Sequence, residues 1–296
     1  MSDVRNKETE PVVGLIGVGL VGSAIADCLA VAGKKVFGFD VASIESVQVE
    51  VCSSAKEVFQ KSNCVFMSLP TSENVSELLA EVSPFITGDH LINDTTTGSE
   101  DAARQHEKLC RNKGAEFVEA TIAGSSELLR KGEASLYVGA TELAFERARP
   151  LLQILSERIY YLGSVGAASR FKLVFNLALG LHRAVLAEAL HFGEALGFPA
   201  ETILEILSDS PGHSTVMDTK GRKMIERDYE PPQARLSQHL KDVRLILETA
   251  DKAGIETPLS ETHRQLLERA EQAGFGAADN AAVREAFRTR PQDPAA

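Results

Sequence analysis

The stretch that decides the fold is Val12-Val-Gly-Leu-Ile-Gly-Val-Gly-Leu-Val-Gly22. Its first five residues form an apolar run typical of a buried strand, and an alanine-rich segment with helical spacing follows at 23–32. Gly17 permits a tight turn, Gly19 lets a pyrophosphate approach the backbone, and Gly22 allows close helix packing. The stretch therefore predicts a strand, a dinucleotide-binding turn and a helix. The residues expected to contact the cofactor are Gly17, Val18, Gly19, Leu20, Val21 and Gly22.

Strands and helices alternate through the rest of the first half of the chain. Apolar, β-branched or aromatic runs mark candidate strands at 35–39, 64–69, 91–93, 117–120, 135–138 and 160–162. Helical patterns lie between them at 53–61, 73–82 and 99–113. Such alternation predicts an α/β domain of the Rossmann type, with a parallel sheet covered by helices, which we place at 11–163.

The pattern becomes entirely helical after Gly163. The segment 167–196 is apolar nearly all round, so we expect one long helix buried inside a domain or a subunit interface. Lys172, Arg183 and Glu188 interrupt it too often for a membrane span. Further helical patterns lie at 200–208, 213–227, 235–253, 258–273 and 279–288. An all-helical domain is therefore predicted at 164–289, and the tails 1–10 and 290–296 are expected to be disordered.

Composition limits the partners and the compartment. A chain of 296 residues agrees with two domains. The excess of 42 acidic over 31 basic residues gives a net charge of -11, which disfavours nucleic acid and an anionic membrane as partners. No signal peptide is visible, so we expect a cytoplasmic protein. Metal-site spacing is absent from the four cysteines, which are Cys28, Cys52, Cys64 and Cys110.

Asp40 bears on the choice of cofactor. It ends the second predicted strand, 18 residues after Gly22, where a carboxylate can accept hydrogen bonds from an adenosine ribose. Its charge opposes a 2′-phosphate, and no arginine or lysine occurs between it and Lys56. We therefore predict NAD rather than NADP as the cofactor. The alternative is that Asp40 is an ordinary turn residue at the end of a strand.

Several ordered motifs together carry a resemblance to a known family. They are Leu69-Pro70, Asp94-Thr-Thr-Thr97, Glu119-Ala-Thr-Ile-Ala-Gly124, Gly163-x-x-Gly166 followed by Lys172 and Asn176, and Lys241-Asp242. With these motifs the sequence resembles the β-hydroxyacid dehydrogenase family, which includes 3-hydroxyisobutyrate dehydrogenase, from about residue 12 to 288. The resemblance implies an N-terminal Rossmann domain, a long connecting helix, and a helical domain that helps to form homodimers or homotetramers.

The resemblance also implies roles for individual residues. Lys172 would be the catalytic lysine, Asn176 a substrate-orienting amide, and Lys241 a contact of the cofactor or the substrate. On an amphipathic helix, however, a Lys-Asp pair such as Lys241-Asp242 is most often a solvated face. The loop Ala123, Gly124 and Ser125 would bind the anionic group of the substrate. The nicotinamide end would be lined by Leu69, Pro70, Asn74 and Thr97.

The position of Lys172 supports the same role independently of the family. Lys172 and Asn176 are spaced i, i+4, so they share one helix face and can meet one ligand. Lys172 lies near the start of its helix, where the macrodipole and partial burial disfavour an ammonium and are expected to lower its pKa. Such a lysine can relay the hydroxyl proton as hydride moves to or from the nicotinamide. The alternative is a surface lysine snorkelling from a buried helix.

The substrate loop departs from the family pattern. The serine expected to help hold the substrate carboxylate is Ala123, and Phe175 replaces the first asparagine of a usual pair. Ala168 replaces a glycine, and Ala234 replaces a phenylalanine. We therefore expect a diverged substrate pocket in which the N–H groups of Gly124 and Ser125, together with the hydroxyl of Ser125 or Ser126, still bind an anion.

These observations predict an NAD(P)-dependent oxidoreductase that interconverts a small 3-hydroxy acid and its oxo or semialdehyde partner. Two alternatives are an NADPH-dependent reductase of an aldehyde, 2-oxo acid or imine, and a non-catalytic nucleotide-binding module. A metal site at Glu188, His191 and Glu194 is not expected, because the second Glu-x-x-His motif that such helical sites need is missing.

Overall fold

A computed structural model describes residues 12–44 and 46–288. The tails predicted to be disordered, 1–10 and 290–296, lie outside the described residues. The chain divides into two compact units, 1–172 and 173–296. Helix α7 (Ala167–Ala195), which the sequence predicts at 167–196, begins in the first unit and continues in the second. The predicted order of a Rossmann domain followed by a helical domain is confirmed.

The first unit is built on a sheet of eight strands in the order β3-β2-β1-β4-β5-β6-β7-β8. The strands are β1 (Val13–Ile16), β2 (Val36–Phe39), β3 (Glu50–Val51), β4 (Cys64–Met67), β5 (Leu91–Asp94), β6 (Glu116–Ala123), β7 (Ser135–Gly139) and β8 (Arg158–Tyr161). Neighbouring strands run parallel except β6 and β7, so the predicted parallel sheet is confirmed apart from this antiparallel pair. The connection between these two strands holds only one short helix, and a parallel crossover usually needs a dozen or more residues.

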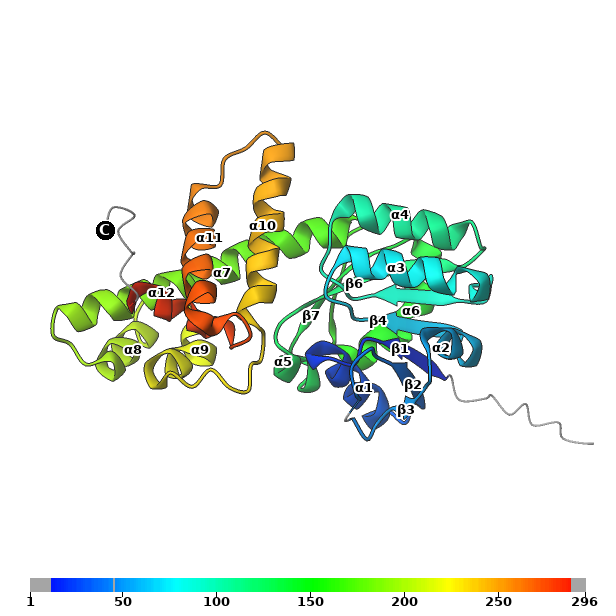
Figure 1. Cartoon of the computed structure of the whole chain (residues 1–296), viewed down its shortest axis with the longest axis horizontal. Coiled ribbons are helices and arrows are strands. Elements are labelled where there is room, and N and C mark those ends of the chain that lie inside the picture. Colours follow the sequence, from blue (N-terminus) through cyan, green and yellow to red (C-terminus); the bar gives the residue numbers. More distant parts are fainter. Residues whose placement is uncertain (1–11, 45, 289–296) are drawn as a thin grey trace, which may run out of the picture. The chain divides into compact units, whose positions relative to one another are not determined.

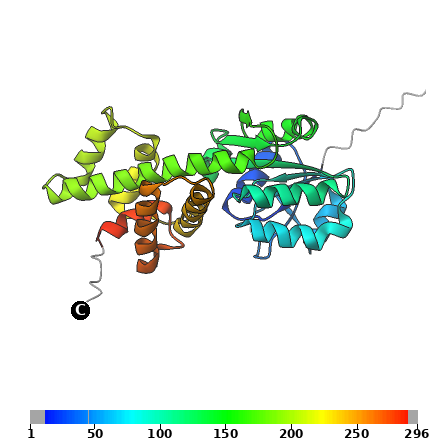
Figure 2. The same cartoon turned by 90° about the horizontal axis from the view of Figure 1, so that it is seen from above.

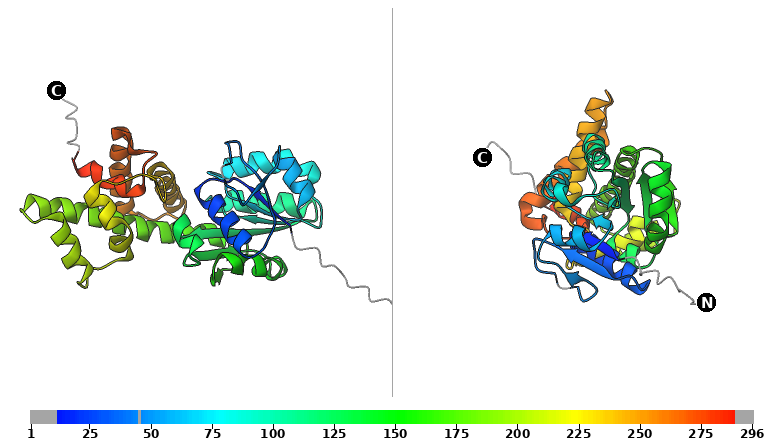
Figure 3. Two further views of the ribbon diagram at one scale, coloured as in Figure 1. Left: turned by 90° about the horizontal axis from the view of Figure 1, so that it is seen from below. Right: turned by 90° about the vertical axis from the view of Figure 1, so that its right-hand side faces the viewer.

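Helices cover both faces of this sheet, as Figures 1 and 3 show. One face packs against α1 (Leu20–Val31), α5 (Ser126–Arg130) and α6 (Glu142–Leu155) through an apolar core. The other face packs against α2 (Ala55–Lys61), α3 (Ser72–Val82) and α4 (Glu100–Arg111). Successive strand residues alternate between the two cores: Leu15 belongs to the first and Ile16 to the second.

Two α-helices and one strand of the first unit were not predicted. Strand β3 has only two residues and lies at the sheet edge, and α5 has only five, so neither produces a clear periodic pattern. Helix α6 contains Pro150, a residue that normally interrupts helices. Its buried side chains Ala148 and Leu152 pack on the sheet, which explains why tertiary packing overrides the local signal.

The second unit, seen from above in Figure 2, is a bundle around the C-terminal part of α7, and its helices Leu236–Lys252 and Pro258–Ala270 lie side by side (Figure 1). Its other elements are α8 (Ala200–Ser208), α9 (Thr215–Glu226), α10 (Leu236–Lys252), α11 (Pro258–Ala270), the π-turn Glu271–Phe275, the 3₁₀ turn Asn280–Arg284 and α12 (Glu285–Arg288). Its core includes Leu186, Leu190, Leu240, Leu267 and Val283.

Helix α7 is also long and apolar enough to cross a membrane, with a mean hydropathy of 1.4 over its most apolar window. Length and composition alone are weak evidence for a span, because the core helix of a soluble protein has the same properties. Here Leu186, Ala187 and Leu190 are packed into the core of the second unit. This packing accounts for the apolar character of that part of the helix.

Candidate functional site

The glycine turn has the backbone geometry that its spacing predicts. Gly17 has a φ of 86°, and a Cβ there would lie 2.2 Å from the carbonyl oxygen of Ser68. A Cβ on Gly22 would lie 1.9 Å from the carbonyl oxygen of Gly17, so the first turn of α1 packs directly on the loop. A Cβ on Gly19 would meet no atom, which leaves the backbone open on that side. The turn therefore fits a pyrophosphate at the N-terminus of α1.

Asp40 lies at the end of β2 and faces this turn. Its carboxylate accepts hydrogen bonds from Val18 N at 2.6 Å and from Ala42 N at 2.9 Å. These bonds tie the end of β2 to the glycine turn and fix the orientation of the carboxylate. Each carboxylate oxygen accepts more than one hydrogen bond, so the group can still bind a ribose hydroxyl.

The residues predicted for the nicotinamide end follow two neighbouring strands. Leu69 comes two residues after β4, and its N–H donates to Thr96 Oγ1 at 3.1 Å beyond the end of β5. Asn74 lies in the first turn of α3, where its N–H donates to the capping Thr71 at 3.3 Å. The structure thus brings the segments with Leu69 and Thr96 together at the carboxyl edge of the sheet, where ligands of such folds bind.

Lys172 is buried, with 6% of its surface exposed, and its Nζ donates a 2.5 Å hydrogen bond to the carbonyl oxygen of Ile122. Ile122 directly precedes the predicted substrate loop, so the lysine lies against the strand that carries this loop. In the loop, Ser125 Oγ accepts from Leu128 N at 3.2 Å and caps α5. Gly124 has a φ of 140°, a conformation that side chains rarely adopt. The structure therefore groups Lys172 with the loop.

Asn176, one turn further along α7, belongs to the second unit, as does its partner. Its Nδ2 donates to Asp242 Oδ2 at 2.9 Å, and Lys241 Nζ lies 3.1 Å from Asp242 Oδ1. Asp242 is 7% exposed and thus joins two residues for which the sequence analysis predicts a role. The sequence analysis assigned no role to Asp242, although it belongs to the Lys241-Asp242 motif. Its position directly after a predicted site lysine could have identified it as a site residue.

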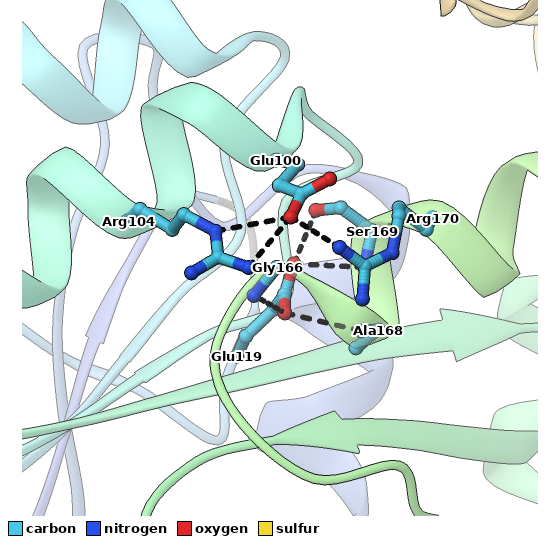
Figure 4. Close-up of polar contacts among 7 residues, drawn as sticks. All are labelled: Glu100, Arg104, Glu119, Gly166, Ala168, Ser169 and Arg170. Carbon is cyan, nitrogen blue, oxygen red and sulfur yellow. Dashed lines mark hydrogen bonds and ion pairs between the residues drawn. The ribbon is translucent and has the colours of Figure 1, made fainter. Parts of the chain in front are cut away.

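Two buried acids of the first unit were also given no role. Asp94, at the end of β5, is directly paired with Glu119 in the middle of β6. Burial raises the pKa of Asp94 to about 7 and also raises the pKa of Glu119, whose hydrogen-bond donors oppose the shift. Figure 4 shows Glu119 receiving hydrogen bonds from the start of α7. The sequence signal for these two residues was a carboxylate within or directly after a predicted apolar strand.

A small polar pocket lies beside these acids, lined by Ser72, Asp94, Thr96, Gly98, Ser99, Ala103, His106, Glu119 and Ser169. His106 Nε2 lies 2.8 Å from Ser76 Oγ, whereas its buried Nδ1 has no hydrogen-bond partner among the described residues. The pocket has room for about one water molecule and is too small for a hydroxy acid. It belongs to the polar interior of the unit.

Glu188, His191 and Glu194 do not form a metal-binding group in the structure. Glu194 pairs with Arg284 at 2.7 Å, and the His191 ring packs at 5.9 Å from that of Phe287. Within residues 12–44 and 46–288, no group of three or more metal-binding side chains is close enough to hold an ion. The four cysteines are free thiols.

Comparison with known proteins places these features in a family. Residues 12–163 match the NAD binding domain of 6-phosphogluconate dehydrogenase. Residues 166–287 match the family described as NAD-binding of NADP-dependent 3-hydroxyisobutyrate dehydrogenase. The chain is 31% identical over 280 residues to 2-(hydroxymethyl)glutarate dehydrogenase of Eubacterium barkeri, covering 92% of this chain and 93% of that protein.

Solved structures agree in fold. A 3-hydroxyisobutyrate dehydrogenase from Salmonella typhimurium has a TM-score of 0.85 at 23% identity, over 93% of this chain and 99% of that one. Psf3 in complex with NADP⁺ and 2-OPP has a TM-score of 0.82 at 22% identity, over 93% and 99% of the two chains. One family model matches the Rossmann region and the other the helical region, and the alignment with the relative that is 31% identical covers 92% of this chain. The chain belongs to the β-hydroxyacid dehydrogenase family.

Proposed function

We propose that this protein is an NAD(P)-dependent dehydrogenase that interconverts a small 3-hydroxy acid and its semialdehyde or oxo partner. The observation that carries this proposal is the buried Lys172, whose Nζ is held 2.5 Å from the carbonyl of Ile122 beside the substrate loop. The nicotinamide dinucleotide supplies the hydride acceptor when it is bound. The similarity to named hydroxy-acid dehydrogenases supports the reaction class.

In this proposal Lys172 moves the proton. Its Nζ takes the proton of the substrate hydroxyl during oxidation and returns it during reduction. Asn176, held by Asp242 at 2.9 Å, orients the substrate, and Lys241 contacts the cofactor or the substrate. The N–H groups of Gly124 and Ser125 bind the substrate carboxylate.

The substrate is, in this proposal, an acid larger than 3-hydroxyisobutyrate. Ala123 supplies no hydroxyl, so the loop makes one polar contact fewer and leaves more room than a serine would. The relative that is 31% identical is named for 2-(hydroxymethyl)glutarate, which carries a hydroxymethyl group and a second carboxylate. A hydroxymethyl-substituted dicarboxylic acid therefore heads the list of compounds to assay.

For the cofactor we propose a preference for NAD over NADP. Asp40 places a negative charge beside the glycine turn, and its carboxylate is fixed by Val18 N and Ala42 N. The neighbour Psf3 binds NADP⁺, which weighs against this preference. Fluorescence titration of the protein with both nucleotides measures it: we expect tighter binding of NAD and a smaller difference in Asp40→Ala. Equal affinities in the unmodified protein would refute the preference.

For the assembly we propose a cytoplasmic homodimer or homotetramer in which a second copy covers part of α7. Large apolar side chains are exposed along this helix in the second unit: Val174 at 60%, Val185 at 61% and Phe192 at 64%. Their spacing of 7 and 11 residues places them along one side of the helix. The functional domains that we propose, 11–163 and 164–289, follow the limits of the two matched family models.

The test is a spectrophotometric assay of nicotinamide reduction with a panel of hydroxy acids, and of oxidation with aldehydes, 2-oxo acids and cyclic imines. Turnover of a hydroxymethyl-substituted dicarboxylic acid by the native protein, lost in Lys172→Ala, is the expected result. Turnover of imines alone would replace the proposal by an imine reductase. Binding of the nucleotide without turnover of any compound would leave a nucleotide-binding module.

A further inference from the structure

A buried carboxylate lies beneath the first turn of α7. Glu119, on β6, is 2% exposed and accepts hydrogen bonds from Gly166 N at 2.8 Å, Ala168 N at 3.2 Å and Ser169 N at 2.8 Å. The hydroxyl of Ser169 donates a further hydrogen bond to the same group (Figure 4). Both oxygens of Glu119 are therefore engaged by the start of the helix, at the positive end of its dipole.

A second contact joins the same two elements one step along the chain. Lys172 comes three residues after Ser169 on α7, and Ile122 comes three residues after Glu119 on β6. Lys172 Nζ donates to the Ile122 carbonyl at 2.5 Å. The lysine thus lies on a helix whose preceding turn is held to the same strand by Glu119, so the position of the carboxylate and that of Nζ are linked.

The surrounding backbone is shaped around this carboxylate. Glu119 is paired with Gly139 across β6 and β7, and a Cβ on Gly139 would lie 2.6 Å from Glu119 Oε2 and 2.9 Å from the carbonyl oxygen of Ser164. Gly166, the first donor, has a φ of 96°. A side chain on Gly139 would therefore displace the carboxylate or the turn, and one on Gly166 would meet Glu100 at 2.8 Å in a backbone conformation that side chains rarely adopt.

A second acid near the same turn serves as an internal comparison. Glu100, on α4, binds Arg104 at 2.7 Å and also pairs with Arg170 of α7 (Figure 4). Its side chain is 29% exposed, and both partners are flexible arginine side chains that are about half exposed. Exposed ion pairs of this kind contribute little to stability, and long flexible side chains hold the backbone of α7 in place poorly. Glu119 differs because it binds the helix backbone directly.

We propose that Glu119 is a positioning residue for Lys172, which fixes the start of α7 on β6 so that Nζ lies beside the loop from Ala123 to Ser125. The consequence for turnover rests on the proposed function, whereas the consequence for the environment of Lys172 does not. A carboxylate is required because its partners are all donors. A glutamine at position 119 would turn an NH₂ group toward N–H donors. An aspartate is one methylene shorter, so its carboxylate would not reach the N–H groups of Gly166, Ala168 and Ser169.

The experiment compares Glu119→Gln and Glu119→Asp with Glu100→Gln, the matched change of a carboxylate to an amide beside the same turn. The first measurement is the rate at which Lys172 is acetylated by acetic anhydride, followed by peptide mass spectrometry and normalised to the exposed Lys131. It requires neither cofactor nor substrate. We expect Lys172 to react at least about five-fold faster in both Glu119 variants, since a misplaced side chain loses its burial, and at an unchanged rate in Glu100→Gln.

The second measurement is the division between kcat and KM in the hydroxy-acid assay. A displacement of about 1 Å in a reacting group costs up to about 100-fold in rate, so kcat is expected to fall by about 10- to 100-fold in Glu119→Gln. The KM for the cofactor is expected to stay within about two-fold, because the glycine turn lies on β1 and α1. Leu152→Ala, a cavity variant on the opposite face of the sheet, provides a control for destabilisation alone and should leave Lys172 labelling unchanged.

Two milder variants keep the test open if Glu119→Gln does not fold. Ser169→Ala removes one donor, and Gly139→Ala pushes a methyl group onto Oε2 while the charge remains. Both should raise the labelling of Lys172 above that of Glu100→Gln. Native labelling of Lys172 in every folded Glu119, Ser169 and Gly139 variant would overturn the proposal. Absence of turnover in the native protein with altered labelling in the variants would overturn the proposed function alone.

Discussion

The described parts of the two units bury different sets of charges: the first buries two acids and one lysine, whereas the second buries three acids together with three bases. In the first, the acids Asp94 and Glu119 are paired across β5 and β6, and burial raises the pKa of both. In the second, burial lowers the pKa of Arg183 to about 10 and, together with Arg183, lowers the pKa of His263 to about 3. Up to residue 172, Lys172 is the only buried lysine or arginine among the described residues. The proposed catalytic group is thus the exception in an acid-lined interior.

The difference predicts opposite responses to pH. Asp94 has a folded-state pKa above its unfolded value of about 3.8, so the stability it contributes is present at low pH and is lost as pH rises toward 7. His263 has a folded-state pKa below its unfolded value of about 6.5, so its contribution is present above that pH and is lost as pH falls toward 3. Acid should therefore weaken the helical unit, and neutral pH should weaken the sheet unit.

The largest effect on activity is expected from substitution of Lys172, the buried lysine of the first unit. Lys172→Ala should lower kcat by about 10²- to 10⁴-fold, since it removes a positioned proton carrier. The dissociation constant of NAD, measured by fluorescence titration, should stay nearly unchanged. Lys131→Ala, which removes an exposed lysine of the same unit, is the control. Full turnover in Lys172→Ala would mean that the buried lysine is structural and that the contrast has no catalytic meaning.

A buried ion pair tests the mixed charges in the interior of the second unit. Lys220 Nζ lies 2.8 Å from Asp279 Oδ1, and both side chains are at most 8% exposed. Lys220→Met should lower the free energy of unfolding by about 3–5 kcal/mol, because Asp279 stays buried without its cation. Urea unfolding at pH 7.5 measures the loss. The control is Lys223→Met, three residues further along α9. Lys223 Nζ donates to the backbone carbonyl oxygen of Asp228 at 3.2 Å, so its loss should lower the free energy of unfolding far less.

Asp94→Asn tests the acidic interior. A shift of about three pKa units corresponds to a pH-dependent loss of at most about 4 kcal/mol between pH 4 and 8. The asparagine keeps an acceptor for Thr96 N, which donates to Asp94 Oδ1 at 2.9 Å, but has no charge. The variant should therefore gain stability over the native protein as pH rises, in unfolding experiments at pH 5 and 8. The exposed Asp89→Asn should follow the native curve; a parallel curve for Asp94→Asn would remove the acid side of the contrast.

The smallest effect concerns an uncharged position of the same unit. Ala123→Ser adds one hydroxyl beside the proposed carboxylate site, and a hydrogen bond to a charged group is worth about 1.5–3 kcal/mol at best. We expect kcat/KM for 3-hydroxyisobutyrate, low in the native protein, to rise by about ten-fold. Efficient turnover by the native protein with no gain from the added hydroxyl would contradict the view that the loop has diverged.

Local signals in the sequence predict most of the secondary structure and the family. The glycine turn, the alternation of strands and helices up to residue 163 and the long helix at 167–196 depend on neighbours within a few residues, so periodicity and glycine spacing predict them. The candidate residues in the glycine turn follow for the same reason. The ordered motifs were specific enough to suggest the family that the comparisons show.

Contacts between residues that are far apart in the sequence can be seen only in the tertiary structure. Glu119 contacts Ser169 across 50 residues, and Asp94 pairs with Glu119 only because β5 and β6 are neighbours in the sheet. No local pattern records such contacts. The antiparallel β7 and the Pro150-containing α6 were decided in the same way, since sheet pairing and core packing outweighed the local signals. The physical reason is that local preferences amount to about 1 kcal/mol per residue or less, whereas burial of a whole helix face supplies many times more.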